Sequence, residues 1–292
     1  MKKVTKVVIP AAGFGTRFLP APKSLPKEMF PIVDTPTLQY VVEEAVQSGI
    51  TDVLIILGKN KKCVEDHFDY APELEQLLQK SNKTASIKVV QDIANMANFF
   101  FIRQKEMKGS GHAIELAKSF VGNEPFGVIY GDDIVYNPEA PALGQLIHAY
   151  EETGKTIVGC QNVPREEAVK YGIVQPGAVK GRYTELKGFV EKPPIDKLPS
   201  TLASMGRYVL TPDIFDALED TAPSPSGEIY LTDAILKVAL SNGAYAYDFE
   251  GKRYDVGDKV GYIQASIEYG LRNKEINQRL KEYIIDLAKN LD

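Results

Sequence analysis

Two cysteines are all that the 292 residues contain, and no apolar run among them is long enough to span a bilayer. Cys63 and Cys160 lie far apart in the sequence and belong to no metal-ligand cluster, which argues against both a disulfide framework and a zinc site. The chain starts with charged residues and enters a strand-like run at once, without the apolar segment of a signal peptide. We therefore expect a cytoplasmic protein that does not bind membranes.

Positive charge is not in excess either. Lys and Arg number 34 against 39 Asp and Glu, which gives a formal net charge of -5. A mildly acidic chain without a basic block is not typical of nucleic-acid-binding proteins. An anionic substrate must then be held by a few placed cations rather than by the field of the whole protein. Apolar residues make up 44% of the chain, which is enough for a large α/β core with a grafted lobe.

Strand-like and helix-like segments alternate along the first half of the chain. Aliphatic or β-branched runs predict strands at residues 4–9, 53–57, 87–90, 126–130 and 157–160. Helical spacing of apolar residues predicts helices at residues 38–47, 113–119 and, interrupted near Pro72, 64–78. This alternation predicts a three-layer α/β/α, Rossmann-like core with a mostly parallel, mixed sheet.

The pattern changes after residue 160. Residues 162–205 hold short extended pieces among many glycines and prolines, which predicts a small antiparallel β insertion over the carboxyl edge of the sheet. The chain then returns to the core with segments typical of strands or helices at residues 208–210, 212–218, 230–240 and 245–249. We expect residues 1–270 to form one domain that includes this insertion.

Residues 271–292 form a separate C-terminal helical segment in this scheme. It is charged, but its apolar residues lie at helical spacing on one face: Ile276, Leu280, Ile284 and Leu287. Packing of that face into the core is the default interpretation, and a contact between subunits is the alternative.

The sequence Ala-Ala-Gly-Phe-Gly-Thr-Arg, residues 11–17, directly follows the first predicted strand. Glycines let the backbone approach an anion and present N–H groups to phosphate oxygens. A dinucleotide-binding loop needs a third glycine and a helix that begins within the loop, but Pro20 and Pro22 block that helix. A Walker loop would need Gly-Lys followed by Ser or Thr, which is absent. The loop indicates phosphate binding of another type, although spacing alone leaves open a tight turn without a ligand.

A cluster of cations accompanies this loop. Arg17, Lys23 and Lys27 lie within one short segment that prolines stiffen. Clustered cations repel one another, so we expect a partner anion. The alternative is a solvated loop in which the lysines pair with Glu28 or Asp34.

Residues 11–45, AAGFGTRFLPAPKSLPKEMFPIVDTPTLQYVVEEA, resemble the start of the bacterial-type UTP–glucose-1-phosphate uridylyltransferases, the UDP-glucose pyrophosphorylases of the sugar-1-phosphate nucleotidyltransferase family. Seven later segments match the same family in order: RQKEMKGSGHAI (103–114), YGDDIV (130–135), YGIV (171–174), VEKP (190–193), GRYVL (206–210), GEIYLTDAI (227–235) and YDVGDKVGY (254–262). Single segments are weak signals, but eight in order are specific. The resemblance implies a nucleotidyltransferase core with residues 162–205 on the sugar side.

The resemblance also implies a role for each matching position. Residues expected to bind the nucleotide are Ala11, Ala12, Gly13, Gly15, Thr16, Gln104, Gly109, Gly111 and Asp132. Residues expected to bind the sugar phosphate are Gly172, Glu191, Lys192 and Gly206. Arg17, Lys27 and Lys192 are the implied catalytic cations. The amide of Gln104 offers both a donor and an acceptor, which suits the edge of uracil.

Mg²⁺ is the implied cofactor, with Asp132 and Asp255 as its carboxylate ligands. Asp132 follows a predicted buried strand, and ligands of open α/β sheets bind where such strands end. Asp133 is the competing ligand, and an Asp pair at that position could instead serve the turn. We interpret His112 as structural or helix-capping rather than as a base.

Glu191 and Lys192 pose a geometric problem because neighbours in a strand point to opposite faces. Both can enter one site only if the chain bends after them, and Pro193 and Pro194 make such a bend plausible.

The implied reaction joins UTP and glucose 1-phosphate to make UDP-glucose and pyrophosphate. A sugar phosphate with a second pKa near ~6 is already ionised at neutral pH, so no general base is needed. Positioning and charge neutralisation would supply the catalysis. We expect the protein to act as a homodimer or homotetramer.

Three alternatives remain at this point: a dTTP- or dual-specific sugar-1-phosphate nucleotidyltransferase, a non-catalytic regulatory homologue, and a dinucleotide-binding dehydrogenase, which the loop prolines disfavour. Residue types do not decide between glucose and galactose or an amino sugar. An unusual stretch at residues 96–101, interpreted as a loop, has no assigned role.

Overall fold

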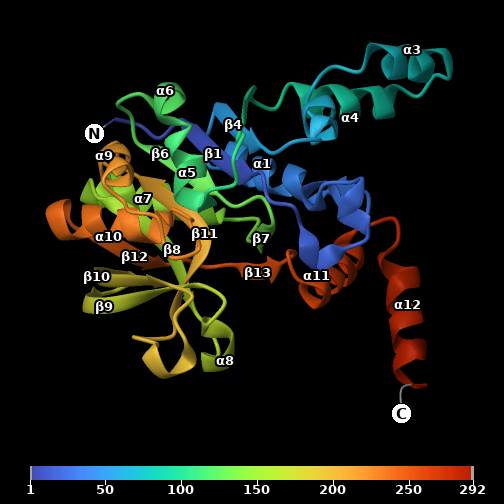
Figure 1. The fold of residues 1–292 in the computed structure, drawn as a ribbon. Coiled ribbons are helices and arrows are strands. Elements are labelled where there is room, and N and C mark those ends of the chain that lie inside the picture. The colour runs from blue at the N-terminus through green and yellow to red at the C-terminus, as the bar shows by residue number, and fades with distance from the viewer. Residues whose placement is uncertain (1, 291–292) are drawn as a thin grey trace.

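In the computed structural model, which describes residues 2–290, a nine-stranded sheet lies between two layers of helices (Figure 1). The strand order is β5–β4–β1–β6–β11–β8–β12–β10–β9, and β10 and β11 run against the other seven. The strands are β1 (Lys6–Ala11), β4 (Asp52–Leu57), β5 (Asn98–Arg103), β6 (Phe126–Ile129), β8 (Thr156–Asn162), β9 (Gly172–Lys180), β10 (Tyr183–Glu191), β11 (Leu202–Leu210) and β12 (Ala244–Asp248). The predicted three-layer core with a mixed, mostly parallel sheet is confirmed.

Both faces of the sheet are apolar because side chains of a strand alternate between the faces. Val7 and Ile9 of β1 belong to the core beneath α1 (Thr37–Gln47) and α7 (Ala142–Thr153). Val8 belongs to the opposite core, beneath α5 (Gly109–Glu115), α9 (Ile214–Glu219) and α10 (Leu231–Asn242). All three side chains are fully buried. Central strands with consecutive apolar residues require cover on both sides, and the two helical layers provide it.

Parallel pairing brings the carboxyl ends of β4, β1 and β6 to one edge of the sheet. A small antiparallel pair, β7 (Asp133–Tyr136) with β13 (Lys252–Asp255), lies at this edge and places Asp255 opposite Asp133. Ile134 and Tyr254 of this pair form a third core with Ala265 of α11 (Lys259–Arg272). Segments more than 100 residues apart therefore meet where ligands of α/β sheets bind.

The remaining short elements connect this framework. They are β2 (Pro31–Ile32) and β3 (Thr35–Pro36), the helices α2 (Lys62–His67), α6 (Lys118–Val121) and α8 (Arg165–Ala168), and the 3₁₀ turns η1 (Thr16–Phe18), η2 (Ala21–Lys23), η3 (Lys27–Met29) and η4 (Ile195–Lys197).

Two predictions for residues 87–101 are wrong. Residues 87–90, expected as a strand, lie inside α4 (Thr84–Ala94), which pairs with α3 (Pro72–Lys80) in an arm that projects from the body (Figure 1). Ile87, Val90 and Ile93 recur every three residues and, with Ala94, are its half-buried positions, so helical spacing outweighs β-branching here. The stretch at residues 96–101, expected as a loop, contains the edge strand β5, which pairs parallel with β4.

Residues 162–205 do contain antiparallel strands, as expected, but these strands do not lie over the sheet. β9 and β10 form a hairpin that extends the sheet itself, because Tyr183–Glu185 of β10 pair with Tyr245–Tyr247 of β12. Hydrogen bonding to an existing strand satisfies the backbone groups of β10, which a lobe stacked over the sheet would leave for other partners.

The C-terminal segment contains α12 (Asn277–Ala288), which extends away from the body in Figure 1. None of its described side chains is buried. The default expectation, that the apolar face of this helix packs into the core, is therefore wrong. Leu280 packs against Gly270 of α11, whereas Leu287 is 44% exposed. Residues 291 and 292 of the predicted segment, like Met1, lie outside the described residues. No helix in the described part of the chain is long and apolar enough to cross a membrane.

Candidate active site

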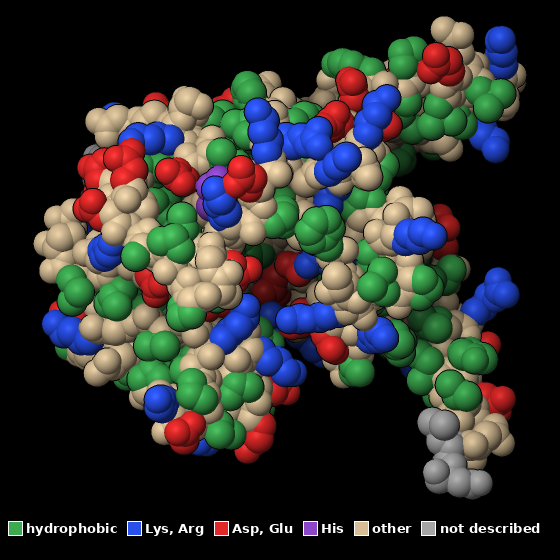
Figure 2. Space-filling model, in the orientation of Figure 1, with side chains coloured by type: hydrophobic (Ala, Val, Ile, Leu, Met, Phe, Trp, Pro, Cys, Tyr) green, Lys and Arg blue, Asp and Glu red, His purple; other side chains and the backbone are tan. Residues whose placement is uncertain are grey.

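Three adjoining cavities form one continuous cleft at the carboxyl edge of the sheet. The first, of about 200 Å³, shares Gly13 and Glu228 with the second, of about 440 Å³. The second shares Arg17 and Asp132 with the third, of about 190 Å³. Figure 2 shows a hollow near the middle of this face, with acidic side chains in its depth and basic side chains along its rim. We call the three cavities together the cleft.

The glycine loop leaves β1 and forms the wall between the first two cavities. Gly15 has φ +66°, a conformation that favours glycine, and a Cβ there would lie 3.2 Å from the side chain of Lys27. Only the short turn η1 follows, so no long helix begins at the loop, as the prolines predict. Gly13, Gly15 and Thr16 all line the second cavity.

Lys27 crosses from the loop to the end of β6. Its Nζ forms an ion pair with Asp132, 105 residues away, instead of with Asp34. The solvated-loop alternative is therefore wrong for Lys27, although Lys23 is exposed. Burial alone would raise the pKa of Asp132, but the Lys27 ammonium outweighs burial and lowers it below its ordinary value. In the same way Asp132 and Glu28 outweigh burial and raise the pKa of Lys27.

A second ion pair fixes the base of this loop, and sequence reasoning missed it. Lys61 Nζ donates to Glu28 Oε2 at 2.8 Å and also bonds the carbonyl oxygen of Ala11. Both side chains are almost fully buried. Burial raises the pKa of Glu28 and lowers that of Lys61, against their mutual attraction. A lone lysine three residues beyond a glycine turn gives no signal of this role in the sequence, because the contact depends on how β1 and β4 pair.

Gln104 lies at the first cavity with its amide held in place. Its Nε2 lies 3.3 Å from the carbonyl oxygen of Gly109 and 3.0 Å from Nδ1 of His112, so His112 orients this amide, in line with a structural role. Ala12 and Gly109 line the same cavity.

Two residues expected at the nucleotide do not line any of the cavities that make up the cleft. Ala11 is buried behind the loop, where its carbonyl oxygen bonds Lys61. Gly111 packs against Ile229 instead, since a Cβ there would lie 2.8 Å from the Ile229 side chain. For Gly111 the structure thus shows a packing reason for the small residue.

Asp132 and Asp255 converge on one point. A Cβ placed on Gly257 would lie 2.8 Å from Asp132 Oδ2 and 3.1 Å from Asp255 Oδ1, so only a glycine leaves that space between the carboxylates. Among residues 2–290 no cluster of three or more His, Cys, Asp or Glu side chains could hold a metal. A divalent cation at this point would take its remaining ligands from water or a substrate, which suits Mg²⁺.

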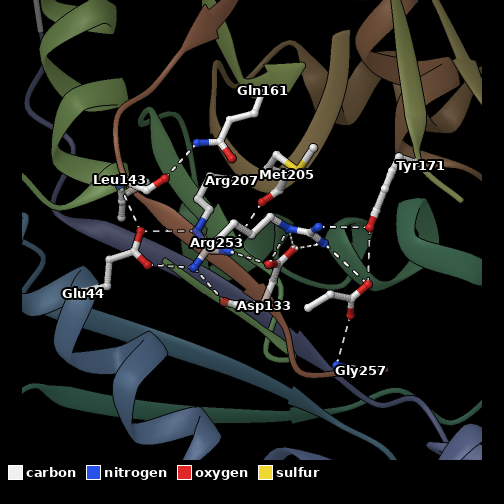
Figure 3. Close-up of polar contacts among 11 residues, drawn as sticks. Glu44, Asp133, Leu143, Gln161, Tyr171, Met205, Arg207, Arg253 and Gly257 are labelled. Carbon is white, nitrogen blue, oxygen red and sulfur yellow. Dashed lines mark hydrogen bonds and ion pairs between the residues drawn. The ribbon is translucent and has the colours of Figure 1, made fainter. Parts of the chain in front are cut away.

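Asp133, the competing metal ligand, is committed to arginines (Figure 3). It accepts from Arg253 Nε at 2.8 and 3.0 Å, and Arg207 Nη1 lies 3.8 Å away. Arg207 is fully buried and also pairs with Glu44 of α1 at 2.7 Å. Burial raises the pKa of Asp133 to about 6 despite both arginines. The structure thus favours Asp132 over Asp133 as the carboxylate that faces the cleft.

The third cavity contains the residues expected on the sugar side. Gly172, Glu191, Lys192 and Gly206 all line it, together with Arg17. Lys192 has φ +44°, which turns the chain directly after β10 and lets both Glu191 and Lys192 enter the same cavity, as expected from the prolines.

Glycine is required at both glycine positions of this cavity. A Cβ on Gly172 would lie 2.8 Å from Thr232, and Gly206 has φ +63°. Sequence reasoning missed six further lining residues: Tyr130, Lys170, Tyr171, Ser204, Tyr208 and Arg253.

A glycine loop after the first strand, three cations and two converging carboxylates define this protein as an α/β enzyme of the phosphate-transferring class. The chain belongs to the Nucleotidyl transferase family, whose model matches residues 6–270.

Named sequence relatives narrow the assignment of this chain within the family. The chain is 52% identical to the UTP–glucose-1-phosphate uridylyltransferase of Staphylococcus epidermidis over 287 residues, which cover 98% of this chain and 99% of the relative. It is also 52% identical to the enzyme of that name from Bacillus subtilis over 284 residues, 97% of each chain. The resemblance drawn from the eight sequence segments is confirmed.

Solved structures agree with the sequence relatives. A UDP-glucose pyrophosphorylase complexed with UDP-glucose superposes with a TM-score of 0.85 at 42% identity, covering 92% of this chain and 100% of the other. A UTP-bound enzyme of the same kind from Acinetobacter baumannii superposes with a TM-score of 0.90 at 36% identity, covering 97% and 99%.

Proposed function

We propose that this protein is a Mg²⁺-dependent uridylyltransferase that converts UTP and glucose 1-phosphate to UDP-glucose and pyrophosphate. The observation that carries the proposal is the convergence of Arg17, Lys27 and Lys192 with the Asp132–Asp255 pair in one cleft. Two polyanions can react only where their repulsion is cancelled, and this cleft gathers side-chain cations and two oxygen ligands for a divalent one. The relatives and the structures bound to UTP or UDP-glucose support this choice of substrates.

The first two cavities suit the nucleotide. Because Nε2 of Gln104 already bonds Gly109 and His112, its Oε1 is the atom that can accept a hydrogen bond from the edge of uracil, and Ala12 and Gly109 leave room for the base. The triphosphate would lie along Gly13, Gly15 and Thr16, which line the second cavity, since the backbone N–H groups of a glycine loop can bind phosphate oxygens. Arg17 is then placed for the departing β and γ phosphates.

Mg²⁺ fits the Asp132–Asp255 pair because both carboxylates face one space that Gly257 leaves open. When bound, the ion would neutralise charge that develops on the reacting phosphates. Lys27 already contacts Asp132, so its ammonium lies within reach of the same phosphates.

The third cavity suits glucose 1-phosphate. Glu191 can accept hydrogen bonds from sugar hydroxyls, and Lys192 can bind the phosphate. An oxygen of that phosphate attacks the α-phosphorus of UTP in line, and the bond from the α-phosphorus to the bridging oxygen of the β phosphate breaks as pyrophosphate leaves. The nucleophile is already ionised at neutral pH, so the residues need only position it and neutralise charge.

Release of pyrophosphate from UTP, glucose 1-phosphate and Mg²⁺ tests the proposal. We expect wild-type turnover that requires all three components and stops when Mg²⁺ is chelated. Lys27→Ala should lower kcat by about 10²–10³, as the loss of an electrostatic stabiliser does in other enzymes. Lys23→Ala, on the same loop but exposed, is the control and should keep wild-type turnover. Near-normal turnover by a folded Lys27→Ala protein would contradict the mechanism, and dTTP in place of UTP tests the nucleotide choice.

We also propose that the protein assembles as a homodimer or homotetramer through α12. Ile276 and Leu280 of its apolar face lie against Gly270 of α11, whereas Leu287 and Tyr283 are 44% and 62% exposed. A second copy of the chain would bury this face.

A further inference from the structure

One arginine of the cleft is committed to protein groups rather than free for phosphate. Arg253 lines the third cavity with Lys192, yet each of its three nitrogens already donates to a protein group. Nε and Nη2 donate to Asp133 at 2.8 to 3.0 Å, and Nη1 donates to the hydroxyl of Tyr171 at 3.0 Å. Its guanidinium also lies 4.8 Å from the centre of the Tyr171 ring. An arginine bound in this way positions its neighbours instead of binding substrate.

Tyr171 links Arg253 to two residues of the proposed reaction. Its hydroxyl lies 3.4 Å from Asp255 Oδ2, and its carbonyl oxygen accepts a hydrogen bond of 3.0 Å from the backbone N–H of Lys192. Lys192 occupies a left-handed conformation that lysine rarely adopts, so its backbone depends on support from outside the strand. The carbonyl of Tyr171 supplies that support at the turn after β10.

We propose that Arg253 and Tyr171 act as a strut that sets the position of Lys192 relative to the Asp132–Asp255 pair. The inference rests on the proposed function and adds two positioning residues to it. The strut is anchored on a rigid base, because Asp133, which binds Arg253, also accepts from the buried Arg207 through its backbone carbonyl at 2.6 Å (Figure 3). It therefore joins the strand pair that bears the carboxylates to the hairpin that bears the sugar-side residues.

A positioning role predicts a selective kinetic defect. Tyr171→Phe removes the hydroxyl and keeps the ring, so kcat/KM for glucose 1-phosphate should fall about 10–100-fold, the range expected for one hydrogen bond to a charged group. The Kd of UTP, measured without sugar phosphate and without Mg²⁺, should change less than about two-fold, because the strut contacts Asp255 but not the glycine loop. Arg253→Lys should show the same split, and the double variant should lose no more than Arg253→Lys alone, because the two residues act as one unit.

The hairpin offers matched controls at its other end. The hydroxyl of Tyr183 also bonds a carboxylate, that of Glu152, and Arg182 also bonds a carboxylate, that of Glu250. Neither lies at the cleft, so Tyr183→Phe and Arg182→Lys should keep wild-type kinetics.

Hydrogen exchange at the amide of Lys192 tests the strut without turnover. Exchange should accelerate in Tyr171→Phe and Arg253→Lys but not in the two controls, since only the strut variants loosen the Lys192–Tyr171 hydrogen bond. A wild-type protein that makes no UDP-glucose would overturn the proposed function and leave this exchange measurement to decide on the strut. Unchanged exchange in Tyr171→Phe, or equal losses for UTP and glucose 1-phosphate, would overturn the strut itself.

Discussion

A single buried side chain, Arg207, ties the floor of the cleft to the helical layer. It is the largest fully buried side chain of the described residues, and it bonds Glu44 of α1, the carbonyl of Asp133 and the carbonyl of Met205. A guanidinium out of water is tolerated only when its donors are satisfied. Removal of the arginine would leave Glu44 as a buried charge without its partner.

We therefore expect Arg207→Met to lower the free energy of unfolding by about 3–5 kcal/mol, the range for breaking a buried ion pair from one side. Urea denaturation measures this change. Addition of Glu44→Leu to Arg207→Met should recover part of the loss, because the unpaired charge is then removed as well. Arg182→Met breaks an exposed pair with Glu250 and should cost less than about 1 kcal/mol. A cost below about 1 kcal/mol for Arg207→Met would show that the network contributes little.

The Lys27–Asp132 pair predicts a pH-dependent contribution to stability. The pKa of Asp132 lies below its ordinary value of 3.8, so folding favours the ionised form. Its stabilising contribution is complete above pH 3.8 and is lost as the pH falls through the lowered pKa. Asp132→Asn should accordingly lower the free energy of unfolding at neutral pH by about 1–3 kcal/mol, with a difference from wild type that shrinks below that pH. Unfolding curves of both proteins from pH 7 downward measure it, and a constant difference would contradict the assignment.

Residue types alone could predict part of this cleft. A glycine loop, a cluster of cations and an Asp at the end of a buried strand are local patterns, and Gly13, Lys27 and Asp132 do meet. Arg253 and Tyr171 could not be found in this way, because an isolated Arg or Tyr is usually an ordinary surface or core residue. Arg253 reaches Asp133 only through the register of β13 against β7, which pairs Arg253 with Val135, two residues along the strand from Asp133.

At the scale of elements, α11 begins so close to β13 that only glycine fits. A Cβ on Gly261 would lie 2.1 Å from the carbonyl oxygen of Asp255. The side chain of Asp258 caps this helix by accepting from the N–H groups of Val260 and Gly261 at 3.0 and 3.2 Å. The first turn of α11 is thus held against the strand that bears Asp255.

Gly261→Ala should displace either the helix or Asp255. We expect an overpacking cost of about 1–3 kcal/mol in the free energy of unfolding, together with a higher Mg²⁺ concentration for half-maximal activity. Gly144→Ala, inside α7, is the matched control, because a Cβ on Gly144 would lie 3.4 Å from Ser48 Oγ, without a clash. This substitution should be neutral or should stabilise the protein by up to about 1 kcal/mol. Thermal unfolding and a Mg²⁺ titration distinguish the two variants, and identical behaviour would refute the steric explanation.

The elements that sequence patterns predicted best are the central ones. Residues 53–57 all lie in the buried strand β4, and residues 126–129 of the predicted 126–130 form the buried strand β6. The errors fall at the periphery, where α4 and β5 have few buried neighbours and local composition misleads. Ile87 and Val90 favour a strand by type, but their three-residue spacing matches the half-buried side of a helix.

At the scale of the whole molecule, α12 and its apolar side chains should control assembly. Ile284→Asp places a charge on that face and should shift the protein toward monomer in light scattering coupled to size-exclusion chromatography. Gln278→Asp adds the same charge on the opposite side of α12 and should leave the mass unchanged. A monomeric wild-type protein, or an assembly that survives Ile284→Asp, would rule out this helix as the contact.

The two ion pairs beside the glycine loop have a consequence for how the protein handles charge during a catalytic cycle. Lys27 and Lys61 are each matched by a carboxylate, Asp132 and Glu28, so both ammonium groups have a counter-charge before any phosphate arrives. When a phosphate takes over the ammonium of Lys27, one oxyanion replaces another and no bare cation is exposed in between. Throughout this exchange the ammonium of Lys27 stays paired with an oxyanion. When the product leaves, Asp132 can pair with Lys27 again, so the ammonium is not left without a counter-charge.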